Sequence, residues 1–206
     1  MTSISFIGLG GMTRAIAGRA VARGHSVEVI GRDAAKTADL AATLGAGVTT
    51  GAFGAVPVGE IVVLAVPYTS AVEVVTTYGE ALAGKIVIDV SNTFTADATG
   101  VLTPEGTSGA QEIAEAAPSD ARVVKAFNTV FGHVLTGDRS LDVLVAGDDP
   151  AAKATVTTFV ESLGLDVFDV GDLAAARWLE AVGPLLMGLA THGAGFDIAL
   201  RVEKVG

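Results

Sequence analysis

Residues 3–36 read SISFIGLGGMTRAIAGRAVARGHSVEVIGRDAAK, and this stretch decides the fold of the chain. Its apolar start, residues 3–7, is typical of a buried parallel strand, and the glycine-rich segment from residue 8 opens a helix predicted to reach about Arg23. Residues 26–30 follow as a second strand. A strand, a glycine turn and a helix inside one βαβ unit are the context in which the pattern G-x-G-x-x-G indicates dinucleotide binding.

The glycine turn suits a pyrophosphate group for a physical reason. Glycine lets the backbone turn sharply and approach the phosphates, whose negative charge then meets the free N–H groups and positive dipole end of the helix. Thr13 replaces the third glycine of the pattern, which loosens the packing of helix on strand but offers a hydroxyl to a phosphate oxygen. A tight turn with a purely structural role is the alternative interpretation.

The end of the second strand indicates which dinucleotide is bound. An acidic side chain there usually holds a free ribose 2′-hydroxyl, whereas an arginine accommodates a 2′-phosphate. This chain has Gly31-Arg32-Asp33, with Lys36 four residues after Arg32. If a helix begins near Asp33, Arg32 and Lys36 lie about one turn apart and converge on one phosphate, while Asp33 caps the helix. NADP(H) is therefore favoured over NAD(H), and a solvated helix start is the alternative.

Composition bounds the class of protein. The chain has 206 residues, of which 50% are apolar and 26 are glycine, and this fits one globular domain with or without a small appendage. It contains no cysteine, which excludes disulfides and thiolate metal sites, and its net charge of −10 argues against nucleic acid or an anionic membrane as a partner. Because the first strand is predicted to begin at residue 3, we expect no signal peptide, and we also expect no membrane-spanning stretch of about eighteen uncharged apolar residues. The sequence therefore favours a soluble, cytoplasmic protein.

The remaining sequence alternates strand-like and helix-like segments. Strands are predicted at residues 61–66, 86–90, 122–127, 141–146 and 167–170, with one short strand in the irregular residues 48–58. Helices are predicted at residues 34–44, 69–78, 109–117, 150–163 and 173–191, the second of them capped by Thr69. The fold class is therefore α/β, a Rossmann-like doubly wound and mainly parallel sheet of about eight strands, the last three extending the usual six. Residues 1–170 would form the nucleotide-binding domain, and residues 171–206 a small helical C-terminal extension packed on it.

Polar residues follow several of the predicted strands. In an open parallel sheet ligands lie beyond the carboxyl ends of the strands, so Gly8, Pro67, Tyr68, Ser91 and Asn92 are expected to share one edge. Residues 95–108 are small and polar and include two glycines and a proline. Such a composition is typical of a long loop, for which function and disorder are open alternatives.

Few side chains offer acid–base or metal chemistry. The three histidines lie far apart in the sequence and form no metal spacing, so no metal site is expected. His25 is expected to be solvated, and His133 follows the Asn128 loop and is a candidate for contact with a ligand. His192 ends the last helix, where a capping, core or substrate contact are open alternatives.

Two charged residues interrupt apolar strands. Asp89 is expected to be paired or hydrogen-bonded, because an unpaired buried charge is costly. Lys125 is expected to reach a carboxylate on a helix, with a catalytic lysine as the alternative. The scarcity of acids and bases favours hydride transfer between a nicotinamide and a second redox cofactor over carbonyl reduction, which needs a placed proton donor.

Several motifs together resemble one family. They are the opening glycine turn, Gly31-Arg32 with Lys36, Leu64-Ala65-Val66-Pro67-Tyr68, Ile88-Asp89-Val90-Ser91-Asn92 and Val123-Val124-Lys125-Ala126-Phe127-Asn128-Thr129. In these motifs the chain is similar to the F420-dependent NADP oxidoreductases and to relatives such as the cytosolic reductase domains of six-transmembrane metalloreductases. The similarity extends through Ala175-Ala176-Arg177-Trp178-Leu179-Glu180 and so covers nearly the whole chain.

The resemblance implies an eight-stranded dinucleotide fold, a homodimer, and hydride exchange between NADP(H) and the deazaflavin coenzyme F420. It implies that the pyrophosphate lies against Gly8, Leu9, Gly10, Gly11, Met12 and Thr13, and the 2′-phosphate against Gly31, Arg32 and Lys36. It implies that the adenosine and ribose lie against Val66, Pro67 and Tyr68, and the nicotinamide against Asn92 and Asn128. The candidates for the hydride-transfer pocket are then Asn92, Asn128 and His133, with residues after Asn128 and in the C-terminal helix lining the second-substrate pocket.

Some features depart from the family pattern. The serine that often accompanies the arginine is Gly31 here, no basic cluster is evident for the anionic tail of F420, and Thr13 resembles the pyrroline-carboxylate reductases. A reductase of flavin, imine or small carbonyl substrates on the same fold is the nearest alternative. A non-catalytic NADP(H)-sensing module is the alternative from another class.

Overall fold

The centre of the protein is an eight-stranded sheet in a computed structural model that describes residues 1–95, 97–98 and 100–205. The strands lie in the order β3-β2-β1-β4-β5-β6-β7-β8, and neighbours are parallel except for the antiparallel pair β6 and β7. Their bounds are β1 Ser3–Ile7, β2 Ser26–Gly31, β3 Thr49–Ala52, β4 Ile61–Leu64, β5 Ile86–Asp89, β6 Arg122–Lys125, β7 Asp142–Gly147 and β8 Asp166–Asp169. The predicted Rossmann-like sheet is confirmed.

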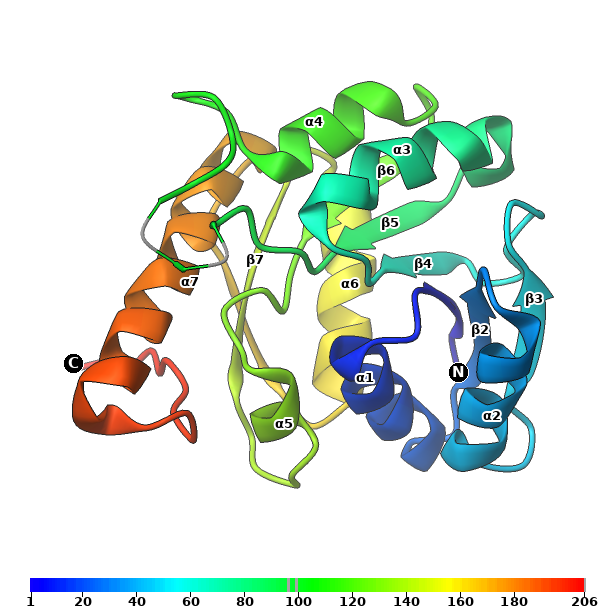
Figure 1. Cartoon of the computed structure of the whole chain (residues 1–206), viewed down its shortest axis with the longest axis horizontal. Coiled ribbons are helices and arrows are strands. Elements are labelled where there is room, and N and C mark those ends of the chain that lie inside the picture. Colours follow the sequence, from blue (N-terminus) through cyan, green and yellow to red (C-terminus); the bar gives the residue numbers. More distant parts are fainter. Residues whose placement is uncertain (96, 99, 206) are drawn as a thin grey trace.

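Helices cover both faces of this sheet. Their bounds are α1 Gly11–Ala22, α2 Ala34–Leu44, α3 Tyr68–Tyr78, α4 Gly109–Ala116, α5 Gly132–Leu135, α6 Pro150–Ser162 and α7 Ala176–Leu189. The short turns η1 Gly79–Leu82, η2 Leu173–Ala175 and η3 Ala190–Ala194 follow α3 and flank α7. In Figure 1, α3 and α4 lie above the sheet, α1 and α2 lie below it, and α7 runs down the left side toward the C-terminus.

Successive residues of the central strands face opposite layers. Ile61 and Val63 of β4 belong to a core with α1, α2 and α6, whereas Val62 and Leu64 belong to a second core with α3, α4 and α7. All four side chains are buried, which is why this strand has no polar break. Helices on both faces are the doubly wound arrangement that the alternation of segments predicts.

The ends of β1 and β4 open a crevice, because the chain continues from these adjacent strands in opposite directions across the sheet. The N–H of Gly8 donates to the carbonyl of Ile30 (2.9 Å) and that of Ala65 to the carbonyl of Ile7 (2.8 Å), which ties three strand ends together. Gly8 has φ +114°, and a β-carbon there would overlap the carbonyl oxygen of Ala65. This turn therefore requires glycine.

Of the two predicted helix caps, Asp33 is confirmed and Thr69 is not. Asp33 caps α2 as predicted, since its carboxylate accepts from two N–H groups of the first turn at 3.0 and 3.1 Å. The prediction of Thr69 as a cap is wrong, because α3 begins one residue earlier, at Tyr68. Pro67 precedes the helix, and its side chain makes no capping hydrogen bond because a proline ring carries no donor or acceptor.

The C-terminal segment contains one long apolar stretch. Among the described residues, the stretch Leu173–Ala194 is long and apolar enough to cross a membrane by length and composition alone. It contains the charged residues Arg177 and Glu180, so it is not the uncharged apolar stretch of about eighteen residues that the sequence is expected to lack. In the fold its first turns pack into a core through Leu173, Ala176 and Leu179, and core helices of folded proteins meet the same criterion. The expectations for positions 96 and 99 of the loop and for position 206 lie outside the described residues.

Candidate active site

Three adjoining cavities follow the carboxyl edge of the described sheet. The outer cavity, about 380 Å³, lies at the ends of β1, β2 and β4; the middle cavity, about 320 Å³, lies between the glycine turn and the residues after β5; and the inner cavity, about 300 Å³, reaches α7. The outer and middle cavities share Gly10, Val66 and Pro67, and the middle and inner cavities share Met12 and Asn92. Together they make one path along the edge that suits a long ligand.

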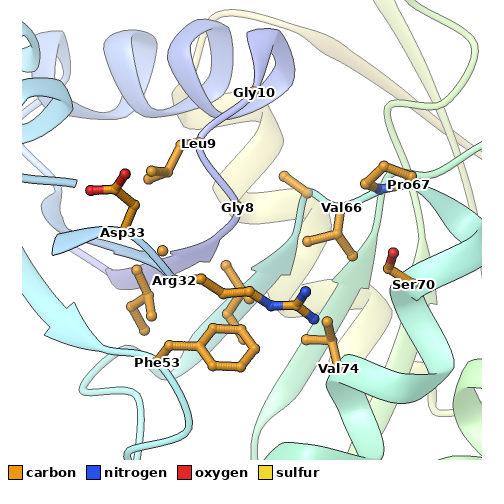
Figure 2. Close-up of a pocket in the computed structure, with 14 residues that line it drawn as sticks. Gly8, Leu9, Gly10, Arg32, Asp33, Phe53, Val66, Pro67, Ser70 and Val74 are labelled. Atoms are coloured by element: carbon orange, nitrogen blue, oxygen red, sulfur yellow. The ribbon is translucent and has the colours of Figure 1, made fainter. Parts of the chain in front are cut away.

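Arg32 lies across the outer cavity. Its guanidinium carbon is 5.1 Å from the centre of the Phe53 ring, and one guanidinium nitrogen is 3.7 Å from the carboxylate of Glu73 on α3. Figure 2 shows the side chain extending over Phe53 toward Val74. The side chains of Arg32 and Glu73 are 61% and 73% exposed, so this ion pair is weak and leaves the guanidinium available to a phosphate.

Lys36 lies outside the lining of the outer cavity. Its ammonium is 3.7 Å from the carboxylate of Asp33 and its side chain is 77% exposed. The hydrogen bond from the backbone N–H of Lys36 lowers the pKa of Asp33, which keeps this carboxylate ionised at the cap of α2. Among the described residues, Arg32 lines the outer cavity and Lys36 does not, and the convergence of both on one phosphate stays a prediction.

Close packing explains why position 31 is a glycine. A β-carbon on this residue would lie 2.6 Å from the side chain of Leu9 and 2.7 Å from the hydroxyl of Thr37. The serine of the family pattern therefore does not fit here without moving its neighbours. Position 31 therefore offers no hydroxyl to a ligand, and the cationic group beside it is Arg32.

The turn between β1 and α1 leaves its backbone open to a ligand. A β-carbon on Gly10 or Gly11 would meet nothing within 4 Å, so the space beside both residues is free. The first turn of α1 contains no acidic residue, and Gly10 has no side chain to cap it. The N–H groups and positive dipole end of α1 are therefore available to a pyrophosphate.

Thr13 has a different role from the predicted one. Its side chain is fully buried, and its hydroxyl donates to the carbonyl of Gly8 at 2.8 Å. The prediction that this hydroxyl bonds a phosphate oxygen is wrong in this structure, because the side chain points from α1 back to the end of β1. Thr13 stabilises the glycine turn from its buried side, through this hydrogen bond to Gly8.

Asn92 and Asn128 form a reciprocal amide pair at the inner cavity. Asn92 Nδ2 donates to the backbone carbonyl of Asn128 (3.0 Å), and Asn128 Nδ2 donates to Asn92 Oδ1 (3.0 Å) and to the carbonyl of Leu179 (2.8 Å). Among the described residues, the buried Oδ1 of Asn128 has no hydrogen-bond partner. A buried acceptor without a partner is unfavourable, so this oxygen is suited to an N–H donor of a ligand, such as a carboxamide.

Phe127 sets the direction of Asn128. It is fully buried and has φ +63°, a left-handed conformation that costs a bulky residue of order 1–3 kcal/mol. Strained residues of this kind gather at ligand sites because the surrounding structure must hold them in place. The turn directly after β6 brings Asn128 opposite Asn92.

The inner cavity is lined by apolar and amide side chains. The lining residues are Met12, Asn92, Phe94, Asn128, Val130, Phe131, Gly132, Gly183, Leu186 and Met187. A β-carbon on Gly183 would lie 2.6 Å from the ring of Phe94, so this glycine lets α7 approach the residues after β5. Among the described residues, the lining contains no ionisable side chain.

His133 faces away from the inner cavity. Its Nε2 is 3.0 Å from the carbonyl oxygen of Phe196 and 3.3 Å from the carboxylate of Asp197. The cavity lining includes the two residues that precede His133 in the chain, Phe131 and Gly132, but not His133 itself. The structure therefore places this candidate against the C-terminal segment.

The other histidines are structural. His25 is not solvated as predicted: it is half-buried, its Nδ1 accepts from the N–H of Thr2 (3.2 Å), and its Nε2 lies 2.8 Å from the hydroxyl of Ser162. Burial lowers the pKa of His25. His192 lies 2.8 Å from the carbonyl of Gly188, which is the capping alternative among those left open for it.

Tyr68 borders the middle cavity. Its hydroxyl donates to the carboxylate of Glu112 on α4 at 2.6 Å. Burial, together with this hydrogen bond, raises the pKa of Tyr68 to about 12. The phenol therefore keeps its proton at neutral pH and uses it in the hydrogen bond to Glu112, so Tyr68 is a poor acid for a substrate.

Several lining residues were not predicted from the sequence, among them the two aromatic residues Phe53 and Phe94. Phe53 lies in a segment with no clear periodicity, and Phe94 opens a loop of small polar residues. A lone aromatic residue among small residues is the signal that marks both positions.

The residues present fit a phosphorylated dinucleotide. Arg32 lies at one end of the path, the open glycines Gly10 and Gly11 lie in the middle, and the unpaired acceptor of Asn128 lies at the inner end. Among the described residues no cluster of ligands suits a metal ion. This fold and site define a dinucleotide-dependent oxidoreductase domain.

Comparison with known proteins places the chain more narrowly. Residues 3–93 match the family "NADP oxidoreductase coenzyme F420-dependent". Over 155 residues the chain is 32% identical to the F420-dependent NADP reductase of Methanocaldococcus jannaschii, an alignment that covers 71% of this chain and 69% of that protein. Over 182 residues it is 32% identical to the metalloreductase STEAP3 of Rattus norvegicus, covering 87% of this chain and 36% of that protein. The chain thus spans about a third of the length of the rat relative.

A solved structure extends the similarity to the whole fold. The chain superposes with a TM-score of 0.86 on a candidate F420-dependent NADP reductase from Arthrobacter sp. FB24, with 28% identity, 99% coverage of this chain and 100% of that one. The protein belongs to the F420-dependent NADP oxidoreductase family, and it is an NADP-dependent oxidoreductase.

Proposed function

We propose that this protein transfers a hydride between NADP(H) and coenzyme F420. When bound, NADPH supplies the hydride from its dihydronicotinamide ring. The open backbone at Gly10 and Gly11 binds the pyrophosphate, and Arg32 binds the 2′-phosphate across the ring of Phe53. Val66, Pro67 and Tyr68 border the adenosine and ribose, and the amide pair of Asn92 and Asn128 orients the nicotinamide.

The observation that carries this proposal is the composition of the inner cavity. Its described lining offers aromatic, sulfur and aliphatic groups, among them Phe94, Phe131 and Met187, but no acid or base. A flat, largely apolar ring stacks well in such a space, which also excludes water from a hydride. An acceptor that needs a proton from the protein, such as a simple ketone, finds no donor there.

The test is an acceptor series with the purified chain. NADPH oxidation is followed with F420, with FMN, with a cyclic imine and with a small ketone, each at the same concentration. We expect turnover with F420 and none with the ketone. Turnover with FMN or the imine alone would replace F420 by that substrate class, and NADPH binding without turnover of any acceptor would favour a sensing module.

We also propose that a second copy of the chain covers α7. Trp178, Leu185 and Leu189 are 63%, 56% and 46% exposed, and their spacing of seven and four residues places them on one face of the helix. Exposed apolar side chains gathered on one helix face suit a protein interface.

In this proposal residues 1–170 form the nucleotide-binding domain, and residues 171–206 contribute both to the dimer contact and to the substrate pocket. A cytoplasmic location stays a prediction that cell fractionation tests.

A further inference from the structure

A buried ionic cluster lies beside the amide pair. Lys125 Nζ on β6 is 2.6 Å from Asp89 Oδ2 on β5 and 2.9 Å from Glu180 Oε1 on α7. The three side chains are 0%, 0% and 2% exposed. Buried charges persist only when they are paired and fully hydrogen-bonded, so these three residues form one interdependent unit. The expected pairing of Asp89 and of Lys125 with a helix carboxylate is thereby confirmed.

The cluster holds the residues on both sides of Asn92. Asp89 Oδ1 accepts from the N–H of Ser91 at 2.9 Å, and Lys125 Nζ donates to the carbonyl of Ser91 at 2.7 Å. On the other side, the hydroxyl of Thr93 donates to Glu180 Oε2 at 3.0 Å. Asn92 is therefore fixed between two residues that the same cluster anchors.

Glu180 also connects this segment to two other elements. Its carboxylate accepts from the N–H groups of Gly109 (3.0 Å) and Ala110 (3.2 Å) at the start of α4. The residue before it, Leu179, accepts the hydrogen bond from Asn128 Nδ2. The turn of α7 at residues 179–180 thus bonds Asn128 directly and reaches Asn92 through its neighbour Thr93. One carboxylate receives bonds from both Thr93 and Gly109, which lie toward the two ends of the segment between β5 and α4.

The geometry points to Glu180, paired with Lys125, as the residue that positions Asn92 and Asn128 for the nicotinamide half of the cofactor. This inference rests on the proposed binding of NADP(H). The lining of the outer cavity comes from the ends of β1 and β2, from residues that follow β1, β2, β3 and β4, and from α3. Glu180 makes none of its described bonds there. Loss of the cluster is therefore expected to affect the nicotinamide end and to spare the adenosine end.

The first variant is Glu180→Gln, which keeps the shape of the side chain but removes the charge that faces Lys125. Calorimetry measures the affinity for NADPH and for adenosine 2′,5′-bisphosphate, a probe that lacks the nicotinamide half. Fluorescence of the bound dihydronicotinamide reports how the ring is held. We expect bisphosphate affinity within about threefold of the wild type, NADPH affinity weakened about tenfold, and the fluorescence gain on binding reduced.

A matched control separates positioning from stability. Glu28 is a buried carboxylate on β2 that bonds the hydroxyl of Ser5 and the N–H of Val58 (3.0 Å), away from the amide pair. Glu28→Gln removes a buried charge of the same kind, and we expect it to leave NADPH affinity and fluorescence unchanged. A second variant, Thr93→Val, removes one bond to Glu180 while keeping the ion pair, and is expected to produce a smaller change in the same direction as Glu180→Gln.

Any of three results would overturn the inference. The first is that NADPH affinity and fluorescence are unchanged in both Glu180→Gln and Thr93→Val. The second is that Glu180→Gln weakens NADPH and bisphosphate binding equally, and the third is that Glu28→Gln shows the same fluorescence change as Glu180→Gln. If Glu180→Gln does not fold, an unchanged Thr93→Val is sufficient to reject it. A wild-type protein that binds neither ligand would instead refute the proposed function, and with it the ground of this inference.

Discussion

The α-carbon of Gly8 faces the carbonyl oxygen of Ala65 so closely that a β-carbon on residue 8 would overlap it. Since Gly8 also has φ +114°, Gly8→Ala is expected to destabilise the fold by several kcal/mol through both overlap and backbone strain. Gly10→Ala provides the contrast, because its β-carbon meets nothing within 4 Å. We expect Gly10→Ala to keep the wild-type melting temperature and to weaken NADPH binding by filling the space for the pyrophosphate. Equal melting temperatures for the two variants would contradict this account of the turn.

Arg32→Ala tests the grip on the 2′-phosphate. A hydrogen bond to a charged group is worth about 1.5–3 kcal/mol, so the dissociation constant for NADPH is expected to rise about 10- to 100-fold, while that for NADH changes little. Lys36→Ala is expected to have a smaller effect, because Lys36 lies outside the cavity lining and 77% of its side chain is exposed. Calorimetry with both nucleotides measures each constant. Equal losses for NADPH and NADH in Arg32→Ala would assign the arginine another role.

The tyrosines provide a pH test. Burial, as the largest cause, raises the pKa of Tyr68 to about 12 and also raises the pKa of Tyr78, whereas unfolded tyrosines titrate near pH 10. The folded state therefore keeps these phenol protons to a higher pH than the unfolded state does. The contribution of Tyr68 to the free energy of unfolding is complete below about pH 10 and is lost as the pH rises toward about 12. Tyrosinate absorbance is expected to stay low at about pH 10 while circular dichroism shows a native fold. Tyr68→Phe is expected to remove the component near pH 12; half-ionised tyrosines at about pH 10 in folded protein would contradict this.

Leu185→Glu tests the proposed dimer contact on α7. A charge placed among exposed apolar side chains that become buried on association is expected to shift the protein from dimer to monomer in sedimentation experiments. Val56→Glu is the control, because Val56 is similarly exposed (66% against 56% for Leu185) and lies in the loop after β3. The wild type and the control are expected to sediment alike. A monomeric wild type would refute the proposal.

Sequence patterns were sufficient for the fold because its signals are local. The bounds of α2, predicted at residues 34–44, match the structure because Asp33 and Gly45 mark its two ends. The unbroken apolar run of β4 follows from burial on both faces, which the sequence shows directly.

The site required contacts between distant segments. The bond between Asn92 and Asn128 joins positions 36 residues apart, and the ion pair of Lys125 with Glu180 joins β6 to α7. No periodicity encodes such pairs, so the sequence indicated a helix carboxylate for Lys125 but not which one. His25 was misjudged for the same reason, since its partners Thr2 and Ser162 become its neighbours only in the folded chain. Thr13 was misjudged although its partner Gly8 is only five residues away, because the sequence does not show which way the hydroxyl points.

The most direct test of the account is the ratio of dissociation constants for NADH and NADPH, measured by calorimetry on the wild-type protein. Because Arg32 lines the outer cavity and Asp33 is engaged at the cap of α2, we expect NADPH to bind at least about tenfold more tightly than NADH. Equal affinities, or tighter binding of NADH, would contradict the placement of a 2′-phosphate at the end of β2.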